Sequence, residues 1–294
     1  MFEKVLVALD FSAHSEHIPD HILELPGIRE AVLLHIVDAS HESIRGWTHG
    51  PEIENAKLLM AEKKEALEKA GLTVHIHVEV LVDVITRGNV AGEILKIAKE
   101  WDVSLIVVGE RATGPLREFF VGSTSVSVIR HATESVLVLH APGTTEAGCG
   151  PCPPPAKLFS RVLVPTDFSP DAGLVFAFIR AIPAIGETIL LNVVDRPDAE
   201  PEIEAAVADV QSRLDAMKKE FSPDVSLRTH IRVGDPAGMI LSVADEDDVS
   251  LIAMSAYGTG RLRDMLPGST TLNVVRATKK PVLVIRTPNP VNSP

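Results

Sequence analysis

Short apolar runs alternate along the chain with segments of helical spacing, and this pattern predicts alternating strands and helices. Lys4–Leu9, Ala31–Val37 and Val103–Val108 are almost continuously apolar, as strands buried on both faces of a parallel sheet are. Glu52–Ala70 carries apolar residues at helical spacing and is followed by Gly71, a residue type that often ends helices. Strands alternating with helices indicate an α/β fold with right-handed crossovers.

The whole pattern occurs twice. The order established in the first half returns from Arg161 to Arg286. We therefore expect two doubly wound, five-stranded parallel-sheet domains of Rossmann-like type, each with strand order 3-2-1-4-5. The remaining elements expected in the first half are a helix from Ser12 to about Leu25, a strand over Thr73–Val82, helices over Ala91–Trp101 and Ser123–His131, and a last strand over Ser135–Leu139.

The residues themselves also repeat. Val5–Ser12 returns as Val162–Ser169, 157 positions later, and Thr113–Thr124 returns as Thr259–Thr270, 146 positions later. The second copy is therefore 11 residues shorter between these blocks. The predicted division is a first domain at 1–143, a linker rich in proline, glycine and cysteine at 144–157, a second domain at 158–288 and a tail at 289–294.

Composition narrows the classes of function. The 294 residues carry a net charge of −12 and include no basic run, which argues against general nucleic-acid binding and against docking on anionic membranes. No apolar stretch approaches the roughly 20 residues of a membrane span. The chain enters its first strand directly from Met1, without a signal peptide pattern. We expect a cytoplasmic protein.

One cysteine pattern and one histidine pattern resemble redox or metal sites. Cys149 and Cys152 form a Cys-x2-Cys motif, but three following prolines prevent the helix that would activate a thiolate. An exposed linker is favoured over redox or metal function. His14, His17 and His21 share one helix face and are absent from the second copy, so a solvated face is favoured over zinc binding.

Candidate ligand-binding residues lie after the first and fourth strands of each copy. Asp10 and Asp167 follow the first strand, and Gly-Ser-Thr begins the helix after the fourth, at Gly122 and Gly268. In the order 3-2-1-4-5 these strands are neighbours whose connections leave in opposite directions, and ligands bind at such a crevice. Free N–H groups at a helix start favour an anion. The alternative is that glycine only makes a turn and serine only caps the helix.

At these residues the chain resembles the universal stress protein family, over both copies end to end. Members that bind nucleotide carry Gly-x2-Gly-x9-Gly-Ser/Thr after the fourth strand. The resemblance implies binding of ATP or AMP, with or without Mg²⁺, the aspartate near ribose and strand-end backbone facing adenine. The residues implied are Ala8, Asp10, Ile36, Val108, Gly109, Ala112, Gly122, Ser123 and Thr124 in the first copy, and Pro165, Asp167, Val193, Met254, Ser255, Gly258, Gly268, Ser269 and Thr270 in the second.

Neither copy keeps the full motif. Ala112 stands at the second glycine position of the first copy, and Ser255 stands at the first glycine position of the second. An added Cβ matters where φ is positive or where the backbone touches phosphate. We expect weakened sites, with the second slightly favoured because it keeps Gly258.

The expected function is a nucleotide-binding sensor or regulator of the stress response. Two alternatives stay open: a nucleotide-free interaction scaffold and a slow ATP hydrolase, the latter disfavoured because no general base or metal cluster stands beside the loop. Each copy ends in an apolar edge strand, and such edges invite pairing. We predict that these two strands pair within one chain as a pseudo-dimer; any further self-association would use other surfaces, and a protein partner stays unidentified.

Overall fold

The structure is a computed structural model of the chain. It describes residues 2–11, 18–38, 50–81, 89–109, 122–140, 157–183, 185–195, 200–221, 225–258 and 267–286. Ala112, Cys149, Cys152, His14 and His17 therefore lie outside the described residues. The chain divides into two units, Met1–Ala141 and Pro142–Pro294, and each is described by itself.

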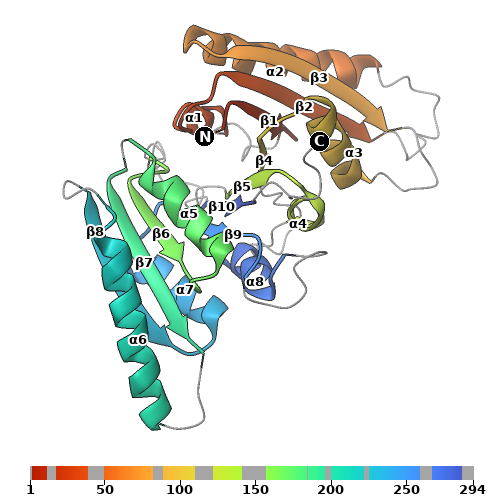
Figure 1. The fold of residues 1–294 in the computed structure, drawn as a ribbon. Helices are drawn as coiled ribbons and strands as arrows, with labels where there is room; N and C mark the ends of the chain where they lie inside the picture. Colours follow the sequence, from red (N-terminus) through yellow and green to blue (C-terminus); the bar gives the residue numbers. More distant parts are fainter. Residues whose placement is uncertain are drawn as a thin grey trace, which may run out of the picture. The chain divides into compact units, whose positions relative to one another are not determined.

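Both units are five-stranded parallel sheets with helices on their faces (Figure 1). The first contains β1 (Lys4–Ala8), α1 (Ile18–Ile22), β2 (Glu30–Asp38), α2 (Gly50–Lys69), β3 (Thr73–Leu81), α3 (Val90–Glu100), β4 (Leu105–Gly109), α4 (Ser123–His131) and β5 (Ser135–Leu139). The second contains β6 (Arg161–Pro165), α5 (Pro170–Arg180), β7 (Glu187–Val194), α6 (Glu200–Lys218), β8 (Ser226–Val233), α7 (Pro236–Glu246), β9 (Leu251–Ser255), α8 (Ser269–Ala277) and β10 (Val282–Ile285).

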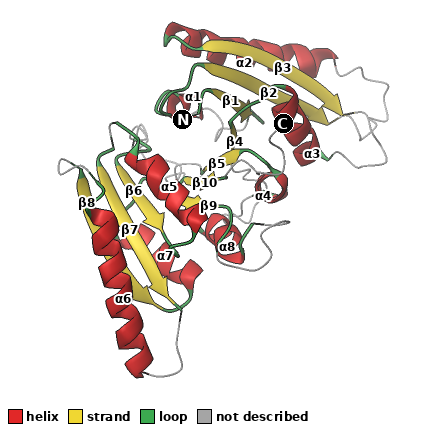
Figure 2. Ribbon diagram, in the orientation of Figure 1, coloured by secondary structure: helices red, strands yellow, loops and turns green. Residues whose placement is uncertain are grey.

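The predicted strand order is confirmed in each unit. The strands run β3-β2-β1-β4-β5 in the first and β8-β7-β6-β9-β10 in the second, and every neighbouring pair within a unit is parallel. In the second unit α5 and α6 cover one face of the sheet, while α7 and α8 cover the other (Figure 2). Consequently β1 with β4, and β6 with β9, form the predicted switch points.

The central strands build the core, because their side chains are buried on both faces. Val5, Leu6 and Val7 of β1 are completely buried, and so are Leu251 and Ile252 of β9. Burying an aliphatic side chain of this size stabilises a fold by about 1.5–3 kcal/mol. The apolar runs in the sequence therefore predict these strands well.

Helix α1 ends earlier than the sequence analysis expected. It stops at Ile22, and two overlapping β-turns follow, in which Glu24 N–H donates to His21 O and Leu25 N–H donates to Ile22 O. Pro26 follows, and a residue before proline avoids helical backbone angles. The expected extension to Leu25 was therefore wrong.

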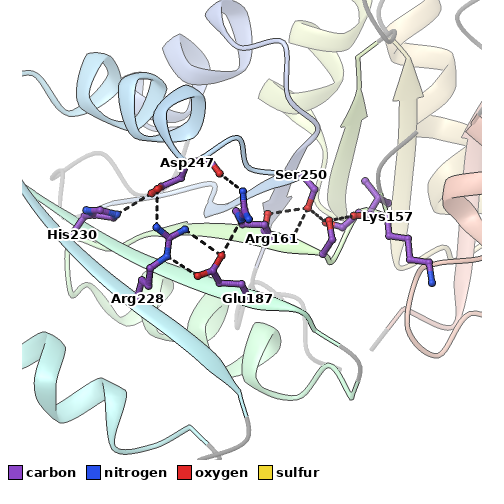
Figure 3. A network of polar contacts seen from close by, with 9 residues as sticks. Lys157, Arg161, Glu187, Arg228, His230, Asp247 and Ser250 are labelled. Atoms are coloured by element: carbon purple, nitrogen blue, oxygen red, sulfur yellow. Dashed lines mark hydrogen bonds and ion pairs between the residues drawn. The ribbon is translucent and has the colours of Figure 1, made fainter. Parts of the chain in front are cut away.

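A polar network closes the amino end of the second sheet (Figure 3). Glu187 accepts hydrogen bonds from Arg161 Nε at 2.9 Å and from Arg228 Nε at 2.6 Å, and Arg228 also donates to Asp247 at 2.9 Å. The hydrogen bond from Arg228 is the main cause that lowers the pKa of Glu187 below its usual value. His230 Nε2 lies 2.9 Å from Asp247 Oδ2 without hydrogen-bond alignment. This network ties β6, β7, β8 and α7 together at the end opposite the candidate site.

At the amino end of the first sheet, the corresponding network combines charged side chains with an aromatic ring. Lys4 Nζ lies 3.0 Å from Glu30, and His75 Nε2 lies 3.2 Å from the same carboxylate. The ring of Trp101 then covers His75, with centroids 5.0 Å apart, and lies 6.0 Å from Lys4 Nζ. Trp101 and Asp247 occupy the same place, since each is the residue that ends the helix before the fourth strand of its unit.

Candidate functional site

The aspartate at the end of β6 is held in a tight turn. Asp167 Oδ1 accepts a hydrogen bond from Ser169 N–H at 3.0 Å, and Thr166 Oγ1 accepts one from Phe168 N–H at 3.0 Å. Phe168 has φ 58°, a conformation that costs a bulky residue free energy and often marks a functional turn. The Arg213 guanidinium lies 3.9 Å from the Phe168 ring centroid. These contacts fix the carboxylate while leaving Asp167 exposed.

Asp167 also faces the loop that follows β9. A Cβ placed on Gly258 would lie 3.0 Å from Asp167 Oδ2, so the carboxylate and this glycine nearly touch. Since the two residues come from the loops after β6 and β9, the structure brings together both sides of the predicted crevice. The expected proximity of the aspartate to the glycine loop is therefore present in the second unit.

The start of α8 lies on the same carboxyl edge of the sheet. Gly268 N–H donates to Ala256 O at 2.9 Å, which ties the helix start to the residue after β9. Gly268 is the N-cap residue, and no side chain accepts from the first turn through that position. Ser269 is the first helical residue and is exposed. In the part of the chain that the structure describes, the amides of this turn therefore have no side-chain cap, and uncapped amides at the positive end of a helix dipole suit an anion.

Two side-chain hydroxyl groups hold the first residues of the loop after β9 in place by hydrogen bonds to backbone carbonyls. Ser255 Oγ donates to Tyr257 O at 2.6 Å, and Thr271 Oγ1 donates to Ser255 O at 2.9 Å. Ala256 N–H donates to Ile285 O of β10 at 3.0 Å. The backbone from Ser255 to Tyr257 is thus held by hydrogen bonds to both α8 and β10, which fixes the point at which Gly258 continues beyond the sheet.

The first unit repeats this arrangement in its described part. Phe11, after Asp10, has φ 54°, and its ring lies 4.4 Å from that of His35. Ser125 Oγ donates to Gly109 O at 3.1 Å, as Thr271 does to Ser255 in the second unit. Gly122 is the N-cap of α4, again with no side-chain cap.

The structure places the candidate residues as follows. The last residues of β1, β4, β6 and β9 are Ala8, Gly109, Pro165 and Ser255. Ile36 lies two residues before the end of β2, and Val193 lies one residue before the end of β7. Val108 in β4 and Met254 in β9 are buried, each one residue before the end of its strand. Asp10 and Asp167 are exposed beyond β1 and β6, whereas Gly122, Ser123 and Thr124, and likewise Gly268, Ser269 and Thr270, form the helix starts. Of the rest, Gly258 lies against Asp167 and Ala112 is outside the described residues.

Sequence reasoning missed the residues that support the aspartate turn from the second strand. His35 Nδ1 lies 2.8 Å from Leu9 O, and Asn192 Nδ2 donates to Thr166 O at 2.7 Å. His35 and Asn192 occupy the same position in the two copies, 157 residues apart. The signal available in the sequence was a polar residue at this position of an otherwise apolar strand in both copies.

Two doubly wound domains, each with an aspartate after its first strand and an uncapped helix start after its fourth, define the class of tandem α/β proteins. The sequence places the chain more narrowly. The model of the Universal stress protein family matches residues 1–140 and 158–286, so the chain belongs to this family in both of its halves.

Relatives of single and of double length resemble the chain. A universal stress protein of Mycolicibacterium smegmatis is 24% identical over 307 residues, covering 96% of each chain. Universal stress protein MJ0577 of Methanocaldococcus jannaschii is 28% identical over 159 residues, covering 45% of this chain and 98% of its own. A solved universal stress protein from Archaeoglobus fulgidus, 21% identical, shares the fold over 96% of both chains with a TM-score of 0.66. These comparisons agree with a tandem universal stress protein.

Among the helices that the structure describes, none combines the length and the apolar character that crossing a bilayer requires.

Proposed function

We propose that this universal stress protein binds an adenine nucleotide, ATP or AMP, at the carboxyl edge of its sheets and acts as a sensor or regulator. In the second copy, Asp167 would bind the ribose hydroxyls, the strand-end backbone at Pro165 and Val193 would face adenine, and the first turn of α8 would bind phosphate. The same roles fall to Asp10, Ala8, Ile36 and the start of α4 in the first copy. The second copy is the stronger candidate because it keeps Gly258.

The observation that carries the proposal is a glycine that the fold itself does not require. Gly268 has φ −56°, which any residue adopts. Among the described residues, the nearest neighbour of a Cβ placed there would be Ala256 O, at 3.9 Å, an ordinary contact. Serine in this position would even cap the helix slightly better than glycine. Both copies nevertheless have glycine, which leaves the helix amides open to the close approach of a phosphate.

Electrostatics support the same assignment. The helix start offers the positive end of the α8 dipole, while the Asp167 carboxylate lies on the other lip of the crevice. A ligand that carries negative charge at one end and hydroxyl donors at the other matches this polarity, and a nucleotide has both. Asp167 has one oxygen bonded to Ser169 N–H, so its orientation is set before any ligand arrives.

The test replaces Gly268 by serine. The hydroxyl should cap α8 and compete with phosphate for the same amides, so thermal stability should be kept or rise slightly while nucleotide affinity at the second site falls by at least about tenfold. Calorimetric titration with ATP, ADP and AMP measures the affinity. Gly173→Ala in α5, where a Cβ meets no atom within 4 Å, is the matched control and should bind as the parent does.

Two outcomes would contradict the proposal. If the parent protein gives no heat and no thermal shift with millimolar nucleotide, the interaction scaffold replaces it. If Gly268→Ser binds nucleotide as tightly as the parent does, the first turn of α8 does not hold the phosphates. Steady release of phosphate by the purified protein, lost in Asp167→Ala, would favour the hydrolase instead.

A further inference from the structure

One charged residue lies beside the proposed phosphate site without belonging to the glycine motif. Arg286 directly follows β10, and its Nη1 donates to Tyr257 Oη at 2.5 Å. The guanidinium carbon lies 5.3 Å from the centre of the Tyr257 ring. Tyr257 is in turn the residue before Gly258, so the arginine is attached to the loop that lines the crevice.

The backbone places Arg286 close to the start of α8. Ile285 O accepts from Ala256 N–H at 3.0 Å, and Ala256 O accepts from Gly268 N–H at 2.9 Å. Ala256 therefore connects the end of β10 to the cap of α8 through two hydrogen bonds. Arg286 is the next residue after Ile285, which brings a permanent positive charge within side-chain reach of the uncapped helix start.

Strand order gives the direction in which a bound nucleotide would run. Adenine is assigned to β7 and β6 and the phosphates to the loop after β9, and β10 is the next strand in the same direction. Neighbouring strands are about 4.8 Å apart. A phosphate chain that continues in this direction therefore moves away from the base and toward Arg286, so that its outer phosphates come closest to the guanidinium.

We propose that Arg286, positioned by Tyr257, reads the outer phosphates and makes the second site prefer ATP to AMP. This inference rests on the proposed nucleotide binding and adds to it a residue that sets phosphate preference. A guanidinium has five N–H donors in a fixed plane, so a hydrogen bond to Tyr257 is compatible with further bonds to phosphate oxygens.

The two copies differ at this position, which makes the preference specific to the second site. Ile285 pairs with Ser255 as Leu139 pairs with Gly109, so His140 is the counterpart of Arg286. A guanidinium keeps its charge and presents a planar fork of N–H donors, which an imidazole does not have. At the corresponding residue, His140, the first copy therefore has no guanidinium.

The chain supplies a probe of the second site, because Tyr257 is its one tyrosine. Incorporation of 3-fluorotyrosine gives a ¹⁹F NMR resonance that belongs to this residue alone. Titrating the full chain with ATP and with AMP while following this resonance yields the affinity of the second site for each nucleotide. Parallel calorimetry and thermal melting show whether each variant is folded and binds.

The variants are Arg286→Met, Arg286→Lys and a control, Arg276→Met. Arg276 is exposed in the last turn of α8, so its removal changes the net charge equally at the far end of that helix. Arg286→Met should weaken ATP binding by about tenfold, since it removes a charged hydrogen-bond donor. AMP binding should change by less than about threefold, because AMP has no outer phosphates. Arg286→Lys should retain part of the preference for ATP, because it keeps the charge and loses the planar donor pair.

The proposal is overturned if Arg286→Met lowers ATP and AMP affinity by the same factor, or if Arg276→Met changes the ratio as much. A folded parent protein that binds no nucleotide would overturn both this inference and the proposed function, whereas a parent that binds with a ratio insensitive to Arg286 would overturn this inference alone.

Discussion

Replacing Gly258 by alanine puts the contact between the two sides of the crevice to a quantitative test. The added Cβ would lie 3.0 Å from Asp167 Oδ2, closer than an ordinary van der Waals contact. The backbone gives no further penalty, because Gly27, Gly71 and Gly234 are the described glycines with positive φ and Gly258 is not one of them. Among the described residues, the cost therefore falls on the Asp167 carboxylate, which must turn or shift.

The magnitude follows from what the carboxylate would lose. Turning Asp167 weakens its hydrogen bond to Ser169 N–H, which costs about 1 kcal/mol at an exposed position. Exchanging glycine for alanine restricts the unfolded chain and returns about 0.4–1 kcal/mol. The free energy of unfolding should thus change by less than about 1 kcal/mol. Nucleotide affinity at the second site should nevertheless fall about tenfold, equivalent to about 1.4 kcal/mol, because Asp167 no longer faces the ribose.

Calorimetry and thermal melting measure the two quantities, and a double-mutant cycle isolates the contact. In an Asp167→Ala background the same Gly258→Ala change should cost almost nothing further, because the carboxylate is already gone. Gly173→Ala provides the same chemical change in α5, where it should stabilise the helix and leave binding alone. Unchanged affinity in Gly258→Ala, or additive losses in the cycle, would refute the proposed coupling of Asp167 to the loop.

Three further outcomes are expected. Hydrogen bonding to Arg228 lowers the pKa of Glu187 from its usual 4.5. The stability that this pair gives the second domain is therefore present above about pH 4.5 and is lost as the pH falls through the lowered pKa. Denaturant unfolding of Arg228→Met should accordingly show a free energy of unfolding that depends less on acid pH. Replacing Cys149 and Cys152 by serine should leave melting temperature and nucleotide affinity unchanged, and a large loss of either would make the linker a functional element. If the two edge strands pair as the sequence predicts, proline in place of Leu283 should remove a ladder hydrogen bond and separate the two halves, and an unchanged radius of gyration in small-angle scattering would contradict that pairing.

The sequence predicts most of the fold because strand and helix signals agree over long segments. The buried runs of β1 and β4 and the helix over Ser123–His131 appear where expected. The predicted end of α1 at Leu25 was wrong because a residue before proline, here Leu25 before Pro26, disfavours helical backbone angles, whereas the helical spacing of apolar residues continued. The positive φ of Phe11 and Phe168 could not be read from the sequence, because phenylalanine rarely adopts it and only tertiary contacts hold it there.

The strand order predicts which candidate residues come close together, whereas the individual contacts between them could not be predicted from the sequence. Asp167, Gly258 and the start of α8 come together as the strand order requires. The hydroxyl bonds of Ser125 and Thr271 to the carbonyl at the end of the fourth strand were not foreseen, because each joins residues 16 positions apart through a buried side chain. The polar network around Glu187 escaped prediction for a related reason, since its members come from four separate elements.

Because the chain contains two copies of one domain, equivalent positions can be compared within the chain to see which interactions both copies keep. At the carboxyl edge they keep the same device, a hydroxyl donating to the end of the fourth strand, although one uses Ser125 and the other Thr271. At the amino edge, the position that the aromatic residue Trp101 occupies in the first copy is occupied by the carboxylate residue Asp247 in the second. Both residues are partners for cationic side chains, because the ring of Trp101 lies near Lys4 and Asp247 accepts from Arg228, so the same position serves the same role through a π face in one copy and a charge in the other.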